Sequence, residues 1–154
     1  MDMDQTSENV QPGLPGARTV IAQAGYRRER LPDGTLVLRL LDARPETVEA
    51  WYQDCNRLMA SWRPGRRLRY VHDIRQAEYV TPFATERVAR VLWRMRQIPV
   101  GDACGAILVH NPTLAALLDS FVRNLSAAGW RIRVFENESE ALTWLSVGEN
   151  RGRD

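Results

Sequence analysis

Short apolar strands alternate with amphipathic helices along most of this chain, and this alternation is the feature that most restricts its fold. Apolar residues recur at steps of three and four over about 45–62, 82–95 and 112–125, and a short strand-like run follows each of these segments. Helices that separate successive strands demand mostly parallel pairing with right-handed crossovers. The sequence therefore predicts one α/β domain.

The helix starts are marked by capping residues and prolines. Thr81-Pro82 and Asn111-Pro112 each place a capping side chain before a proline at the first helical position. Pro45 suits the same position, and Asn137 followed by Glu140 resembles a capping box before a short last helix. We therefore expect four helices.

Strands are expected at 35–41, 68–74, 104–109 and 131–135, and the apolar run from Cys104 to Val109 is typical of a central strand covered on both faces. Before them, Thr19 to Leu31 leads into Pro32-Asp33-Gly34, a turn that predicts an N-terminal hairpin. The expected fold is a mixed, mostly parallel sheet of about five strands with this hairpin and four helices. Cys55 has no CxxC partner and, like Cys104, is expected to be a small core residue.

Composition sets the boundaries and excludes several classes of protein. The chain has 154 residues, enough for one core, and we expect a disordered leader at 1–18, one domain at 19–146 and a disordered tail at 147–154. No apolar run approaches the roughly 20 residues that span a bilayer, and no secretory signal precedes the domain, which predicts a cytoplasmic protein without integral membrane insertion. A net charge of +2 is too small to indicate nucleic-acid binding.

The element order and the closing segment resemble a known family. A strand ending in Phe135 runs into a capped helix that contains Glu140-Ala141-Leu142 and Trp144-Leu145, and this ending is similar to that of the SpoIIAA-like branch of the STAS superfamily of anti-sigma-factor antagonists. The resemblance covers about 26–145. It implies a SpoIIAA/STAS-like fold and a non-catalytic regulatory module that binds a protein partner or a second copy of itself as a homodimer.

The resemblance also directs attention to one hydroxyl group. In the best-known antagonists, a partner kinase phosphorylates a serine where a helix begins after the third strand, and the matching stretch here, Val80-Thr81-Pro82-Phe83, contains neither that serine nor the family's glycine. Thr81 is the phosphorylation candidate, with a plain N-cap as the alternative. The branch also resembles the lipid-binding CRAL-TRIO/SEC14 domains in fold, so a carrier or sensor of a small apolar ligand is the alternative function.

Polar residues collect where two neighbouring strands end. His72, Asp73 and Arg75 close one strand, and His110 and Asn111 close the next, at the edge where open α/β sheets bind ligands. However, alternation in a regular strand points His72 and Asp73 to opposite faces, and Asn111 already serves as a helix cap. A small enzyme that uses His72, Asp73 and His110 is thus a further alternative.

Motifs for catalysis or cofactor binding are absent from the sequence. It contains no GxSxG, P-loop or GxGxxG pattern and no zinc-ligand spacing. We therefore expect a protein that is not an enzyme and that uses no cofactor and no metal.

The predicted helix at 82–95 carries a row of arginines. Arg87, Arg90 and Arg94 are spaced along one side, Glu86 can pair with Arg90, and Trp93 falls outside the apolar stripe. Such a surface suits an acidic protein or anionic lipid headgroups, and an exposed tryptophan suits an interface. The alternative is a solvated helix face.

Overall fold

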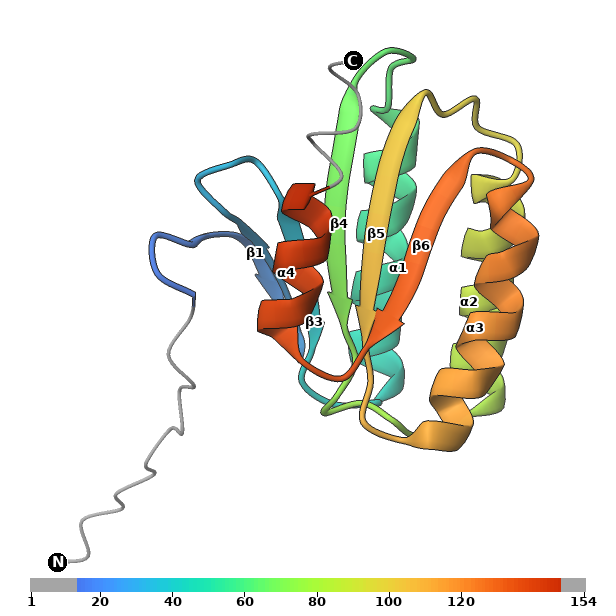
Figure 1. Ribbon diagram of the computed structural model, residues 1–154. Coiled ribbons are helices and arrows are strands. Elements are labelled where there is room, and N and C mark those ends of the chain that lie inside the picture. The colour runs from blue at the N-terminus through green and yellow to red at the C-terminus, as the bar shows by residue number, and fades with distance from the viewer. Residues whose placement is uncertain (1–13, 148–154) are drawn as a thin grey trace, which may run out of the picture.

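The computed structural model describes residues 14–147 (Figure 1). Six strands and four helices follow one another in the order β1 (Arg18–Gln23), β2 (Tyr26–Arg30), β3 (Leu36–Leu40), α1 (Pro45–Ala60), β4 (Arg67–Asp73), α2 (Pro82–Met95), β5 (Asp102–Leu108), α3 (Pro112–Ser126), β6 (Trp130–Phe135) and α4 (Glu138–Val147).

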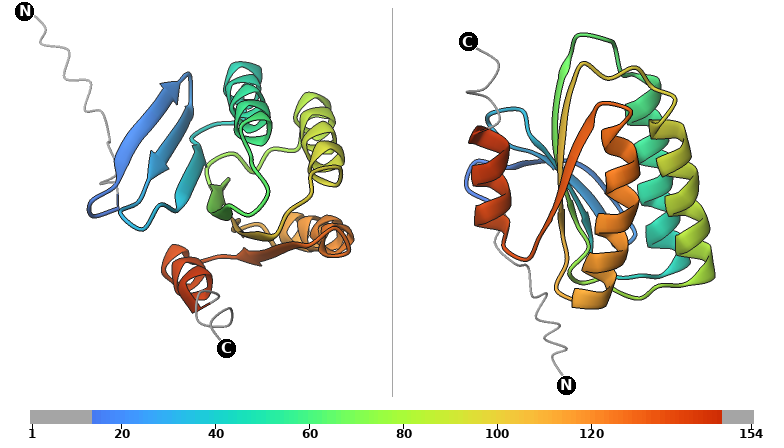
Figure 2. Two further views of the ribbon diagram at one scale, coloured as in Figure 1. Left: turned by 90° about the horizontal axis from the view of Figure 1, so that it is seen from above. Right: turned by 45° about the vertical axis from the view of Figure 1, so that its right-hand side comes forward.

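The strands form one sheet in sequence order, β1-β2-β3-β4-β5-β6. The first three pair antiparallel and the last four pair parallel. Because the parallel strands are added in one direction through right-handed crossovers, α1, α2 and α3 all cover the same face, which we call the three-helix face. The C-terminal α4 lies on the opposite face, the α4 face (Figure 2).

The helix starts confirm the capping predictions. Thr81 Oγ1 accepts a hydrogen bond from the backbone N–H of Ala84 at 3.1 Å, and Asn111 Oδ1 accepts two from the first turn of α3. Asn137 Oδ1 likewise accepts from the N–H of Glu140 at 3.2 Å. The prolines at 45, 82 and 112 occupy the first turns, where no N–H is required.

The strand count exceeds the prediction by one, because 19–31 forms two strands instead of one hairpin arm. A turn at Ala24-Gly25 separates β1 from β2, and Ala24 adopts a positive φ of 50°. The N–H of Gly25 donates to Thr47 Oγ1 at 3.0 Å, and a Cβ at this glycine would lie 2.3 Å from Asp42 Oδ2. Contacts with Asp42 and with Thr47 at the start of α1 therefore require glycine in this turn. No local sequence pattern predicts the turn.

Each face of the sheet has its own core. On the three-helix face the buried side chains come from α1, α2, the sheet and the end of α3, whereas Val37, Val71 and Leu108 pack on the α4 face against Ala141 and Leu145.

The described elements extend slightly beyond the bounds predicted for the domain. Leu14 packs on the α4 face and β1 begins at Arg18, so 14–18 of the predicted leader belong to the domain. The helix α4 reaches Val147, and the rest of the predicted leader and tail lies outside the described residues. None of the helices in the described part is long and apolar enough to cross a membrane.

Candidate functional site

The polar residues predicted at the strand ends do not form one site. His72 and Asp73 lie on opposite faces of the sheet, as alternation along β4 predicts. The His72 ring contacts Trp51 of α1 on the three-helix face. Asp73 forms an ion pair with Arg39 on the α4 face, and Arg39 also pairs with Glu138 of α4. No hydrogen bond or ion pair within the described residues joins His72 to Asp73 or to His110. The described structure therefore does not bring His72, Asp73 and His110 together.

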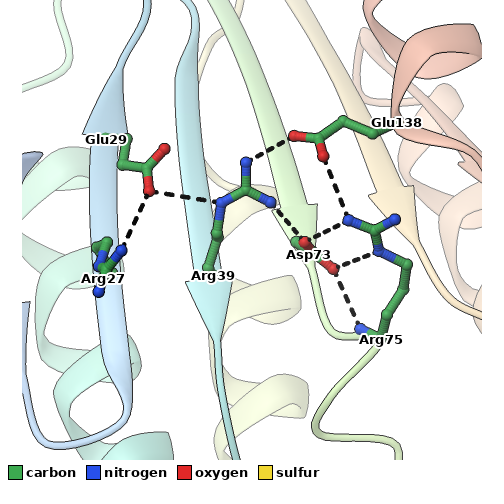
Figure 3. Close-up of polar contacts among 6 residues, drawn as sticks. All are labelled: Arg27, Glu29, Arg39, Asp73, Arg75 and Glu138. Atoms are coloured by element: carbon green, nitrogen blue, oxygen red, sulfur yellow. Dashed lines mark hydrogen bonds and ion pairs between the residues drawn. The ribbon is translucent and has the colours of Figure 1, made fainter. Parts of the chain in front are cut away.

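Asp73 belongs to a network of ion pairs where β3 and β4 end and α4 begins (Figure 3). Arg39 donates to Asp73 at 2.6 Å and to Glu138 at 2.6 Å, and Arg75 donates to Asp73 at 2.8 and 2.9 Å and to Glu138 at 3.3 Å. Glu29 joins through Arg39 at 3.5 Å, and Arg27 contacts Glu29 at 3.8 Å. The network thus links β2, β3 and the end of β4 to the first turn of α4, about a hundred residues after β3.

Charge balance indicates a structural role for this network. Three arginines face three carboxylates, so no net charge remains to attract a ligand. Burial alone would raise the pKa of Asp73, but the hydrogen bonds and charge of Arg75 and the charge of Arg39 outweigh it and hold this pKa below its ordinary value. The network fixes the first turn of α4 to the sheet.

The other two predicted strand-end residues lie at the start of α3. The carboxylate of Glu78 accepts hydrogen bonds from the backbone N–H groups of His110 and Asn111. The His110 side chain is exposed. This arrangement holds the loop after β4 against the start of α3.

His72 lies in an apolar and aromatic environment. Its ring centroid is 5.2 Å from that of Tyr70 and 5.9 Å from that of Trp51. Among the described residues its imidazole makes no hydrogen bond or ion pair, and burial lowers its pKa to about 4. At neutral pH His72 is therefore an uncharged imidazole whose nitrogens are available to a ligand.

A cavity of about 480 Å³ lies beside His72, between α1 and the three-helix face of the sheet. This volume is within the usual range of small-molecule sites. The inner wall is apolar and includes Leu36, Leu38, Cys55, Met59, Met95 and Trp130 together with Tyr70 and His72. The exposed residues of the lining gather at the amino end of β4 and at the β2–β3 turn, where the cavity meets the surface.

The wall of this cavity depends on one close approach. Tyr70 of β4 faces Gly105 of β5 in the parallel register, and its ring lies directly on the glycine. A Cβ at position 105 would lie 2.2 to 2.5 Å from atoms of the Tyr70 ring and hydroxyl. The ring therefore occupies space that only glycine leaves free, and its edge contacts Trp130 with a centroid separation of 6.4 Å.

A second, almost wholly apolar cavity of about 220 Å³ lies between α2 and α3. It shares four wall residues with the first cavity, namely Tyr70, His72, Val91 and Met95. Exposed apolar side chains border it: Tyr79, Val80, Leu117 and Phe121. The two cavities are thus separated by a shared set of side chains.

The arginines of α2 do not form the free row that the sequence suggested. Arg87 pairs with Glu49 of α1 at 2.8 Å and lies over the rings of Tyr52 and Phe83. Arg94 donates to Asn56 of α1 at 2.7 Å. These two side chains therefore fasten α2 to α1.

The rest of this surface agrees with the sequence. Arg90 makes the expected pair with Glu86 at 2.5 Å, and Trp93 is 64% exposed. Thr81 uses its hydroxyl oxygen as the cap of α2, which leaves phosphorylation of this residue as a prediction.

The cavity wall was not recognised from the sequence. Cys55, Met59 and Trp62 have the helical spacing of ordinary core residues, and nothing in that pattern separates a packed wall from a hollow one. The available signal was Gly105 inside an apolar strand, which often marks a close approach of another group. In the described part of the chain no group of three His, Cys, Asp or Glu side chains lies close enough to hold a metal ion.

Comparison with known proteins supports the fold. No protein-family model matches the sequence, and no curated protein matches it significantly. Among solved structures, it is similar to an uncharacterised protein of the DUF3478 family from Shewanella loihica PV-4, described as having a SpoIIAA-like fold, with 16% identity and a TM-score of 0.52. The match covers 86% of this chain and 99% of that one. The chain therefore has a SpoIIAA-like fold, which confirms the predicted architecture.

Proposed function

We propose that this protein is a non-catalytic module that binds a small, largely apolar ligand in the cavity beneath α1. One observation supports this function most strongly: the cavity of about 480 Å³ contains the imidazole of His72 with no described protein partner. An unpartnered polar group in an apolar wall is costly unless water or a ligand satisfies it. One polar anchor in an apolar site is also how small-molecule pockets orient their ligands.

The absence of a catalytic arrangement around the cavity supports a binding role. Among the described residues, no base, acid or nucleophile lies within hydrogen-bond reach of His72. Its aromatic neighbours cannot orient the imidazole for proton transfer. Cys55 lies in the same wall, but burial raises the pKa of its thiol and suppresses the reactive thiolate. The cavity is therefore suited to holding a molecule and not to transforming it.

Octanol is a suitable neutral probe for this site. At ten times its Kd, a ligand that binds only the folded state stabilises a protein by about 1.4 kcal/mol, which raises the thermal unfolding midpoint measurably. The replacement Cys55→Phe places a ring inside the cavity and should abolish the rise. Ala60→Phe adds the same ring to an exposed position of α1 outside the lining and should retain it.

The outcomes separate clearly. A midpoint that responds in the unmodified protein neither to octanol nor to octanoate, a charged probe with the same chain length, would refute the proposed function. An equal response in the Cys55→Phe protein would place the ligand elsewhere, and Met59→Trp gives a second way to fill the same cavity if Cys55→Phe does not fold.

A second candidate function is that of a regulatory protein-interaction module, as in the family that the fold resembles. The observation that favours it is the apolar border of the second cavity, where Leu117 and Phe121 are 46% and 42% exposed and Tyr79 is 79% exposed. Exposed aromatic side chains beside an apolar groove are typical of protein interfaces. Replacing Phe121 with Asp should dissociate a homodimer measured by light scattering, if the groove binds a second copy.

A further inference from the structure

The mouth of the larger cavity lies at a gap in the sheet. Strand β4 begins at Arg67, but its pairing with β3 begins only at Tyr70, opposite Leu36. Residues 67–69 therefore extend beyond β3, and the β2–β3 turn lies alongside them in the cavity lining. The gap gives the apolar interior an exit to solvent at the amino end of the sheet.

Arginines dominate this mouth. Arg30 and Arg66 are exposed, and neither side chain makes a hydrogen bond or ion pair with any described residue. Two further arginines in the lining, Arg67 and Arg69, share the carboxylate of Asp102 at 2.9 and 3.1 Å.

Counting the charges leaves the mouth positive. Within the described residues, the lining arginines Arg30, Arg66 and Arg69 outnumber the two nearby carboxylates, those of Asp33 and Asp102. Asp102 also forms an ion pair with Arg131 at 2.9 Å, so its single negative charge is shared among three guanidinium groups. An anion at this position would meet an excess of positive charge.

One donor at this end also lacks an acceptor. Arg69 is only 7% exposed, and its terminal nitrogens bind Asp102 and the carbonyl oxygen of Leu68. Its Nε atom is buried and has no hydrogen-bond partner among the described residues. Buried donors of this kind are rare in folded proteins, and a bound anion or ordered water normally satisfies them.

The apolar interior and the arginine mouth together define the chemistry of the ligand. We infer that the cavity takes an amphipathic anion, with its hydrocarbon part between α1 and the sheet and a carboxylate or phosphate group at Arg30 and Arg66. This inference rests on the proposed function and adds the charge and the orientation of the ligand. A guanidinium group suits both headgroups, because its planar donors match the oxygens of either.

Octanoate, octyl phosphate and octanol test the inference, because they share one chain and differ in the headgroup. Their affinities can be measured by quenching of tryptophan fluorescence, since Trp62 and Trp130 line the cavity. We expect octanoate to bind about tenfold more tightly than octanol at low ionic strength, and salt to reduce this difference. The ratio of octyl phosphate to octanoate then distinguishes a phosphate headgroup from a carboxylate.

A double variant, Arg30→Ala with Arg66→Ala, should lower the affinity for octanoate about tenfold and leave that for octanol unchanged. The matched control, Arg90→Ala with Arg123→Ala, removes the same charge from α2 and α3 outside the larger cavity and should bind octanoate normally. Equal binding of octanoate and octanol, or an equal loss in both variants, would overturn the inference while leaving the proposed function intact. No binding of any probe would refute both.

Discussion

The replacement Gly105→Ala tests the cavity wall most sharply. The added methyl group would lie 2.2 Å from the nearest ring atom of Tyr70, well inside van der Waals contact, and the Tyr70 side chain is buried. Over-packing of a buried site costs about 1–3 kcal/mol, and this overlap involves two ring atoms and the hydroxyl oxygen, so we expect a loss of about 3 kcal/mol in the free energy of unfolding. Urea denaturation measures this loss.

Two further variants isolate the cause. Gly101→Ala adds the same methyl group where nothing lies within 4 Å, so its stability should change by less than about 1 kcal/mol. In a Tyr70→Leu background the overlapping ring atoms are gone, and Gly105→Ala should then cost about 1 kcal/mol or less. A full penalty that persists in the Tyr70→Leu background would show that the ring does not depend on this glycine, and the described wall would be wrong.

Three other perturbations have defined outcomes. Burial lowers the pKa of His72 to about 4, so as the pH falls below 6.5 the unfolded state binds a proton at this histidine before the folded state does. The free energy of unfolding should therefore fall by up to about 1.4 kcal/mol per pH unit between pH 6.5 and 5. The difference between the unmodified protein and His72→Leu in urea denaturation should show this slope, and His110→Gln should not alter it. Tyr26→Phe removes the 2.6 Å hydrogen bond to the buried Asp54 carboxylate and should cost about 2 kcal/mol by the same method; a cost below about 0.5 kcal/mol would contradict that bond. Thr81→Ala removes the α2 cap and should cost about 1 kcal/mol, whereas Thr81→Ser should be nearly neutral; equal losses would exclude capping.

Local signals were sufficient for most of the fold. The caps at Thr81 and Asn111 and the alternation along β4 determine helix starts and side-chain directions within a few residues of sequence, and the structure follows them. The Ala24-Gly25 turn was missed because contacts with Asp42 and Thr47, about twenty residues away, require it.

The candidate site was less predictable for the same physical reason. The sequence around Arg87 indicates a solvent-exposed charge on α2, but in the structure Arg87 contacts Glu49 and Tyr52 of α1. The cavity exists because side chains of α1, α2 and the sheet do not fill the space between these elements. The hydrophobic periodicity of the sequence indicates only which side chains face inward. A hollow wall and a packed wall therefore have the same sequence pattern.

The methyl groups of methionine provide the most direct test of the central claim. The chain has four methionines, of which Met59 and Met95 line the cavity while Met1 and Met3 lie at the N-terminus outside the described residues. Titration of ¹³C-methyl-methionine protein with octanoate should shift the Met59 and Met95 resonances in NMR spectra with a common Kd and leave the other two unchanged. Unchanged Met59 and Met95 resonances at saturating octanoate would contradict a ligand site in this cavity.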